Sequence, residues 1–380
     1  MRAGVDFLYL FDIEPMDRLY DIALSMMPSI SCRVRRQLYA LYEHAEDLFG
    51  LSQSELQQLF PSHRNIVRDL QDETFVRRAE REMEFAQRNG IRILHFTDPE
   101  YPQRLNLPDC DDTPTILYFK GNADLNNQRS LAVVGTRKAT EYGKRMTATT
   151  INGFKQENIL IVSGLAYGID TVAHVAAVSN QLPTVGVVAH GLDMLYPPSN
   201  QRLAEQMMQH GGLITEYASG TNILPAYFPA RNRIIAAMAD GTLVAEASEK
   251  GGALITANMA LSYHRDLMAF AGRSGDIYSK GCNRLIATQR ALLVEDSNDI
   301  LHAMRWERRQ DSTGTQTQLF VDLEPDEQRV FDAIRESDGM TIEDLRTKTG
   351  MPLGQVSTLL LQLELKNLCQ CLPGKRYKAY

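Results

Sequence analysis

The sequence predicts an α/β protein with an extended Rossmann-like, doubly wound parallel sheet, a small helical domain before it and a winged helix after it. Three observations predict this arrangement. Residues 1–90 carry helical periodicity without a strand-like run, residues 91–305 alternate short apolar runs with helix-length segments, and residues 325–380 divide into three helices and a terminal hairpin. Residues 306–324 are polar and rich in turn-forming residues, which indicates a linker.

The first domain is expected to consist of short amphipathic helices separated by polar breaks. Ser52 followed three residues later by Glu55 predicts a capping box at one helix start. Small helical units of this kind either bind DNA phosphates or serve only as packing elements, and the sequence leaves both interpretations open.

The central domain is predicted from seven apolar runs, each separated from the next by a helix-length segment. Because the runs are apolar throughout, they indicate parallel strands covered by helices on both faces. The runs lie at residues 131–135, 159–163, 184–189, 212–216, 242–247, 266–272 and 291–295, after two further apolar segments, "IRILHF" and "PTILYFKG".

The last domain has the order of a winged helix. Thr341 is placed to begin one helix and Gly350 to end it, and "LPGKR" supplies a turn between two short strands. The helix expected over 352–366 would read DNA in such a domain, yet it offers glutamine, serine, threonine and one lysine where arginines are usual. An interaction or regulatory module is therefore weighed beside DNA binding.

Composition excludes several classes of protein. The formal net charge of −7 excludes a polybasic coat for nucleic acid, so a polyanion would have to meet a local basic patch. No segment approaches the ~20 apolar residues that span a bilayer. The five cysteines are scattered and form no paired CxxC motif, so we expect no metal centre, no disulfide framework and a reducing cytoplasm.

Glycine-bearing loops after the predicted strands suit a phosphate, because glycine lets backbone amides approach an anion near a helix start. These loops contain Gly135 with Arg137, Ser163-Gly164 with Gly168, and Lys250-Gly251-Gly252. A dinucleotide is disfavoured, since no GxGxxG follows the first strand and Ser163-Gly164 stands where an acidic residue would hold the ribose. No GxxxxGK[ST] is present either, so no nucleotide cofactor is expected.

Arginines and aromatic residues fall in or near the same loops. Arg231 and Arg233 flank Asn232 at a predicted helix start, where they could bind phosphate oxygens or pair with neighbouring carboxylates. The aromatic residues are Tyr142, Tyr167, Tyr196, Tyr227 and Phe228. Stacking rings beside a basic groove are typical of proteins that bind single-stranded nucleic acid.

The motifs "VVGTRKATEYG", "SGLAYGIDTVAH", "VGVVAHGLDMLYPPSN", "FPARNRIIAAM", "VAEASEKGGALITANMA" and "GCNRLIA" resemble, in order and spacing, those of the DNA-processing protein A (DprA/Smf) family. The resemblance covers residues 90–305, and residues 325–380 resemble the family's winged helix. The N-terminal part is in the position of the family's SAM or helix-hairpin-helix-like domain. The chain departs from the family pattern at His190, Pro198, Gly251 and His264.

The resemblance implies a cytoplasmic protein without a cofactor or catalytic activity that binds single-stranded DNA and forms a homodimer through its Rossmann-like domain. It implies that the protein protects incoming DNA and loads the RecA recombinase onto it during natural transformation, past single-strand-binding protein. It also implies that the DNA-binding residues are Gly135, Thr136, Arg137, Ser163, Gly164, Gly168, Phe228, Arg231, Asn232, Arg233, Lys250, Gly251 and Gly252.

Two alternatives from other classes are a Rossmann-like nucleotide phosphoribohydrolase and a nucleotide sensor. The hydrolase is disfavoured because no acid follows "KGGALITANMA" closely enough to act from the next helix turns. Asp170, Asp193, Glu216 and Glu246 lie near strand ends and could act as general acids or bases, or could cap helices and pair with Arg231 and Arg233.

Overall fold

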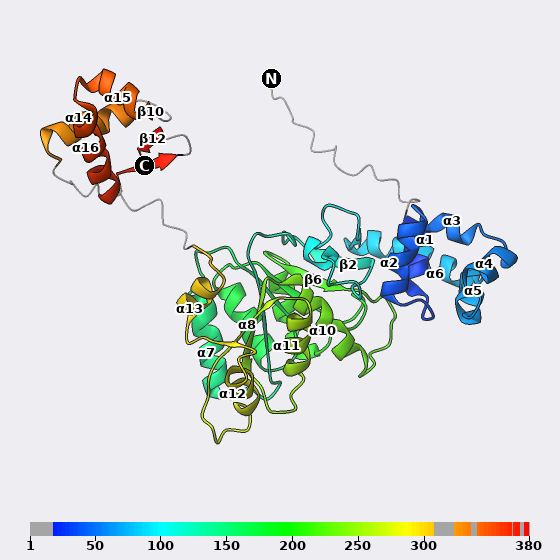
Figure 1. Cartoon of the computed structure of the whole chain (residues 1–380). Helices are drawn as coiled ribbons and strands as arrows, with labels where there is room; N and C mark the ends of the chain where they lie inside the picture. The colour runs from blue at the N-terminus through cyan, green and yellow to red at the C-terminus, as the bar shows by residue number, and fades with distance from the viewer. Residues whose placement is uncertain (1–17, 308–322, 336–339, 367, 373–375, 380) are drawn as a thin grey trace, which may run out of the picture. The chain divides into compact units, whose positions relative to one another are not determined.

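The computed structural model describes residues 18–307, 323–335, 340–366, 368–372 and 376–379. The chain forms two compact units that divide between residues 309 and 310 (Figure 1), and each is described by itself. Most of the residues expected to form the linker lie outside the described ranges.

The first unit begins with helices, as the periodicity predicts. Ser52 and Glu55 form the predicted capping box at the start of one of them, each bonding the other's backbone amide. The longest helix ends at Gly90, whose φ of 62° is the left-handed conformation that glycine adopts readily. The helices are α1 (Leu19–Met26), α2 (Cys32–Leu41), α3 (Ala45–Phe49), α4 (Gln53–Leu59), α5 (Arg64–Leu70) and α6 (Glu73–Asn89).

A nine-stranded sheet follows, in the order β1-β2-β6-β5-β4-β3-β7-β8-β9. Its strands are β1 (Arg92–His95), β2 (Ile116–Gly121), β3 (Ser130–Gly135), β4 (Leu160–Ser163), β5 (Thr184–Val187), β6 (Gly212–Thr215), β7 (Gly241–Glu246), β8 (Asp266–Ala269) and β9 (Leu292–Leu293). Between them lie η2 (Gln103–Asn106), α7 (Glu141–Asn152), α8 (Ile169–Ser179), η3 (Pro198–Asn200), α9 (Gln201–Met207), α10 (Tyr227–Met238), α11 (Ala253–Ser262), α12 (Lys280–Ala287) and α13 (Ser297–Ala303).

The seven predicted parallel strands are confirmed as β3–β9, which pair in parallel throughout. The two segments before them extend the sheet differently, since β1 and β2 are antiparallel and β2 joins β6 in antiparallel register. The chain winds from β3 outward to β6 and then restarts on the other side of β3 with β7. This reversal is the topological switch point, where open α/β sheets bind their ligands beyond the carboxyl ends of the strands.

Helices cover both faces of the sheet, so the predicted doubly wound arrangement is confirmed. Ala132 and Val134 of β3 lie in a core with α10, α11 and α12. The alternate residues Leu131 and Val133 lie in a second core with α7, α8 and α13. Successive side chains of a strand point to opposite faces, so these cores lie on opposite sides of the sheet.

The helical segment is joined to the sheet by polar contacts. Arg36 on α2 donates to the carbonyl oxygen of Thr113 at 3.2 Å, and the Glu82 carboxylate on α6 accepts from the backbone amide of Ser219 at 2.9 Å. The loop that contains Ser219 follows β6. The helical segment therefore contacts the loop before β2 and the loop that leads from β6 to α10.

The second unit has the winged-helix elements that the sequence predicts: α14 (Pro325–Arg335), α15 (Ile342–Thr349) and α16 (Leu353–Leu365), with a small sheet of β10 (Met340–Thr341), β12 (Arg376–Ala379) and β11 (Cys369–Leu372) in that order. Thr341 caps α15 and Gly350 ends it at a φ of 74°, both as predicted. The turn residues 373–375 lie outside the described ranges. Throughout the described part of the chain, the helices are too short or too polar to cross a bilayer.

Candidate nucleic-acid interface

The loop between β3 and α7 presents Arg137 to solvent at the switch point. Its guanidinium lies over the ring of Phe228, 5.2 Å from the ring centroid, and this cation–π contact holds the side chain above α10. The backbone beside it is fixed, because the amide of Thr136 donates to the carbonyl oxygen of Glu246 at 2.7 Å. Arg137 is thus an exposed cation on an ordered support.

Gly168 braces this loop against the one that follows β4. It has a φ of 80°, and a Cβ added there would lie 2.2 Å from the carbonyl oxygen of Thr136 and 2.7 Å from the carbonyl carbon of Arg137. The next amide, that of Ile169, donates to the same Thr136 oxygen at 3.3 Å. Only glycine allows the two loops to approach this closely.

Replacing Gly168 by alanine is expected to lower the free energy of unfolding of the first unit by about 1–3 kcal/mol, from backbone strain alone, with the overlap on Thr136 adding to it. Trp306 is the chain's single tryptophan and packs against the core beneath α7 and α8, so its fluorescence during denaturant unfolding reports on this unit. Gly252→Ala is the matched control, since a Cβ there meets no atom within 4 Å. Equal stability of the two variants would contradict this role of Gly168 in the packing of the two loops.

The carboxylate of Asp170 occupies the backbone amides of the β4–α8 loop. Its Oδ2 accepts from the amides of Gly164 at 3.2 Å and Ala166 at 3.4 Å. Burial raises the pKa of Asp170 to about 6, although the nearby Arg231 guanidinium acts in the opposite direction. The amides that the sequence suggested for an external anion are therefore engaged by the protein's own acid.

Glu246 plays the same part at the start of α7. Its carboxylate accepts from the backbone amide of Thr140 at 2.9 Å and from the Thr140 hydroxyl. A helix start at a switch point is where a bound dinucleotide places its phosphates. Because Glu246 already accepts from these donors, they are not free to bind a nucleotide phosphate. This agrees with the missing GxGxxG.

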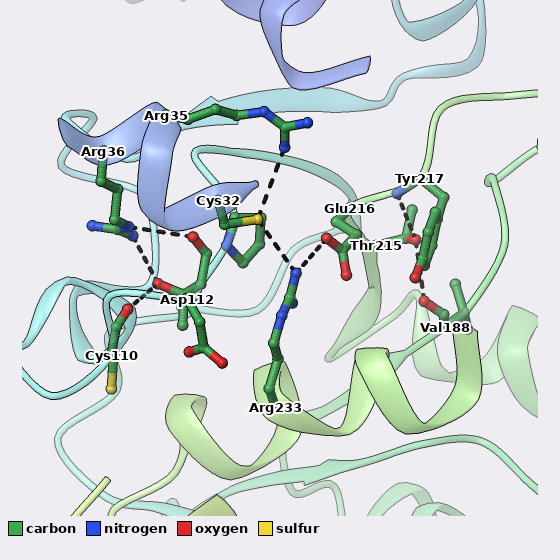
Figure 2. A network of polar contacts seen from close by, with 12 residues as sticks. Cys32, Arg35, Arg36, Cys110, Asp112, Val188, Thr215, Glu216, Tyr217 and Arg233 are labelled. Carbon is green, nitrogen blue, oxygen red and sulfur yellow. Dashed lines mark hydrogen bonds and ion pairs between the residues drawn. The ribbon is translucent and has the colours of Figure 1, made fainter. Parts of the chain in front are cut away.

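A third carboxylate pairs with Arg233. Arg233 donates to Glu216 at 2.6 Å, and their side chains are only 12% and 13% exposed. Figure 2 shows that the same nitrogen, Nη2, also contacts the Cys32 sulfur of α2, at 3.5 Å. The pairing with a carboxylate, one of the alternatives open from the sequence, is the one found.

Arg231 is buried inside the sheet domain, with 3% of its surface exposed. It donates to the carbonyl oxygens of Gly164 and Val187. A Cβ on Gly164 would lie 2.6 Å from Arg231 and 2.7 Å from Asp170, so this glycine leaves room for the two charges. Ser163 is also fully buried and donates to the carbonyl oxygen of Val133.

Aromatic rings extend the exposed surface beside Arg137. The ring of Tyr196 packs edge-on against Phe228, with centroids 5.8 Å apart. His190 holds Tyr196 in place, since its Nε2 accepts from the Tyr196 amide at 3.1 Å. We call Tyr196, Phe228 and Arg137 the Arg137 row.

The other candidate residues are distributed around this row. Asn232 accepts from Arg231 through its side chain, and Gly135 packs on Ile169. Lys250, Gly251 and Gly252 follow β7, the neighbour of β3, and lead into α11, with Lys250 and Gly252 exposed. The candidate residues thus divide by exposure. Arg137 and Lys250 are exposed and Phe228 is half-buried, while Ser163, Gly164 and Arg231 are buried beneath the same edge of the sheet.

Sequence reasoning included helix capping by Glu246 among its alternatives but did not identify its partner, and it missed the role of His190. Glu246 acts on a residue 106 positions earlier in the chain, and no local pattern signals such a contact. His190 follows β5 by three residues and departs from the family pattern, so its position could have drawn attention to the Tyr196 loop.

Comparison with known proteins agrees with this arrangement. The model of a family described as DNA recombination-mediator protein A matches residues 92–305, and that of the DprA winged helix domain matches residues 316–375. The chain is similar to Protein Smf of Synechocystis sp., with 31% identity over 329 residues that cover 78% of this chain and 82% of the relative.

Two solved structures are similar over most of their length. The DNA processing protein A of Streptococcus pneumoniae aligns with a TM-score of 0.56 and 31% identity, covering 72% of this chain and 98% of that one. A structure of the Helicobacter pylori protein, described for its single-stranded DNA binding mode, aligns with a TM-score of 0.51 and 25% identity, covering 57% and 95%. The chain, matched over its sheet domain and its winged helix, belongs to the DNA-processing protein A (DprA/Smf) family.

Proposed function

We propose that this protein binds single-stranded DNA along the Arg137 row. The observation that carries the proposal is the exposed Arg137 guanidinium, held on the Phe228 ring beside Tyr196. A guanidinium binds phosphate oxygens, and rings with a free face stack on bases of any sequence. The similarity to the H. pylori protein supports the same ligand.

In this proposal the predicted site residues divide into two groups. Arg137, Lys250, Phe228 and the backbone of Thr136, Gly251 and Gly252 contact DNA. Gly135, Ser163, Gly164, Gly168, Arg231, Asn232 and Arg233 position the loops and the helix that carry them. The division follows exposure, since Arg231 and Ser163 are buried and Arg233 is paired with Glu216.

Binding without catalysis fits the surroundings of the buried acids. Asp170, Glu216 and Glu246 accept hydrogen bonds from the loop amides, from Arg233 and from Thr140, respectively. A carboxylate that already serves as a cap or an ion-pair partner is poorly placed to act as a general base. We therefore propose a cytoplasmic binding protein that needs no cofactor.

Because the chain belongs to this family, the proposal also covers its dimerisation and the delivery of bound DNA to a recombinase. We propose a homodimer through the sheet domain, and delivery of the bound strand to RecA in the presence of single-strand-binding protein during natural transformation. The exposed leucines of the edge strand β9, Leu292 and Leu293, offer an apolar surface for such a contact.

Fluorescence anisotropy with a labelled oligonucleotide of ~30 nucleotides, single-stranded and as a duplex, tests DNA binding across a salt series. We expect preference for the single strand, with affinity falling as salt rises because phosphate contacts release counterions. Three phosphate contacts for each protomer would give a slope of about −2 in log K against log salt. Equal binding of the duplex, or affinity independent of salt, would overturn the proposal.

A further inference from the structure

A wide cleft opens beside the Arg137 row, between the first turn of α7 and the loop that joins β8 to α12. Its volume is about 1050 Å³. Tyr142 and Arg145 line it from α7, and Arg273, Ile277 and Tyr278 line it from the loop. None of these five residues belongs to the site described above.

The cleft presents rings and an apolar side chain to solvent. Tyr142 is 37% exposed, and Ile277 is 67% exposed. The hydroxyl of Tyr142 donates to the carbonyl oxygen of Ala271 at 2.7 Å, which fixes its ring against the opposite wall. A fixed, partly exposed ring is a suitable surface for a stacked base.

The cleft also carries two arginines without a carboxylate partner. Arg145 and Arg273 are both exposed, and in the part of the chain that the structure describes neither forms an ion pair. Two acids, Glu141 and Asp276, also line the cleft. Glu141 is paired with Lys144 at 2.7 Å. Arginines beside exposed rings are the combination that single-stranded nucleic acid requires.

The cleft continues the Arg137 row along the same edge of the sheet. Thr140, three residues after Arg137, is part of its lining. In the sheet β5, β4, β3, β7 and β8 are consecutive, so β5 and β8 lie about 19 Å apart by strand spacing, with β3, which leads to Arg137, between them. A strand bound at Arg137 and running this way would reach the cleft.

We propose that the cleft is a second subsite for the same DNA strand, in which a base stacks on Tyr142 or Tyr278 and Arg145 and Arg273 neutralise neighbouring phosphates. The inference rests on the proposed function and adds the direction and length of the bound strand. A free nucleotide is the weaker occupant, because Glu246 places its carboxylate at the helix start beside the cleft, where a small phosphate would otherwise bind.

A ladder of oligothymidylates from 4 to 20 nucleotides, measured by anisotropy at one salt concentration, tests the subsite. Arg137→Ala is expected to weaken binding at every length. Arg273→Ala and Tyr278→Ala are expected to leave the shortest bound oligonucleotides unaffected and to weaken the longest by about fivefold or more. Tyr278→Phe keeps the ring and is expected to bind like the parent.

The possible outcomes separate the subsite from the proposed function. If the parent binds no oligonucleotide of any length, DNA binding itself fails and the subsite fails with it. If Arg137→Ala weakens binding but Arg273→Ala and Tyr278→Ala match the parent at all lengths, only the subsite is wrong. A weakening by the cleft variants that is equal at all lengths also overturns it, because it indicates an effect on the fold or on overall charge.

Photo-cross-linking provides a measurement on the parent chain that does not depend on a variant's folding. A 20-nucleotide strand with 5-iododeoxyuridine at successive positions is expected to cross-link to peptides containing Tyr142 or Tyr278 from positions toward one end, and to Tyr196 or Phe228 from the other. Cross-links to the Arg137 row from every position, with none to the cleft, would overturn the second subsite.

Discussion

Arg137→Ala is expected to weaken single-stranded DNA binding by about 10- to 150-fold, because a charge-assisted hydrogen bond to phosphate contributes about 1.5–3 kcal/mol. The guanidinium is exposed and held over Phe228, so its removal takes away a phosphate contact without opening a core. All DNA sequences should lose affinity alike, since a phosphate contact carries no base information. Anisotropy titrations with several sequences in moderate salt measure the effect.

Lys155→Ala is the matched control for Arg137. Lys155 is exposed and precedes β4, so it lies at the opposite edge of the sheet, and its loss changes the net charge by the same amount. We expect this variant to bind like the parent, and Arg137→Lys to retain part of the affinity through its charge. Parent-like binding by Arg137→Ala would show that the interface lies elsewhere.

Glu216→Ala is expected to lower the free energy of unfolding of the first unit by about 3–5 kcal/mol, because it leaves a buried guanidinium without its counter-charge. Arg233 would keep only the Cys32 sulfur, and its Nη1 already has no hydrogen-bond partner in the described structure. Denaturant unfolding followed by the fluorescence of Trp306 measures the loss.

Two further variants separate the buried pair from a general effect of lost charge. Glu249→Ala breaks an exposed pair with Arg284 and is expected to cost less than about 1 kcal/mol. The double variant Glu216→Leu/Arg233→Met is expected to recover most of the stability, since apolar residues of similar volume replace buried pairs well. Unfolding of Glu216→Ala at the parent's midpoint would contradict this account of the pair.

The sheet could be predicted from the sequence because local patterns determine it. Apolar runs of five to seven residues located β3–β9, and the side-chain signals at Ser52 and Thr341 located two helix starts. The antiparallel addition of β2 beside β6 could not be predicted, since the pairing joins segments almost a hundred residues apart.

The candidate site was only partly predictable, because the motif gives residue types and not the direction of a side chain. Arg231 and Arg233 are two positions apart on α10, so they project to different sides of the helix. One enters the sheet domain and the other meets Glu216 and α2, while Arg137, from a different loop, is the exposed cation. Which arginine faces solvent depends on tertiary packing.

The carboxylates of Asp170 and Glu246 have a consequence for selectivity in a cell that contains many free nucleotides. Because these acids occupy the amides of Gly164 and Thr140, a monomeric nucleotide would find fewer backbone donors in these loops. A polymer engages several such contacts at once, and each contact raises the effective concentration of the next. If the proposed function holds, the protein would distinguish a strand from a monomer by the number of simultaneous contacts, without a pocket that excludes the monomer.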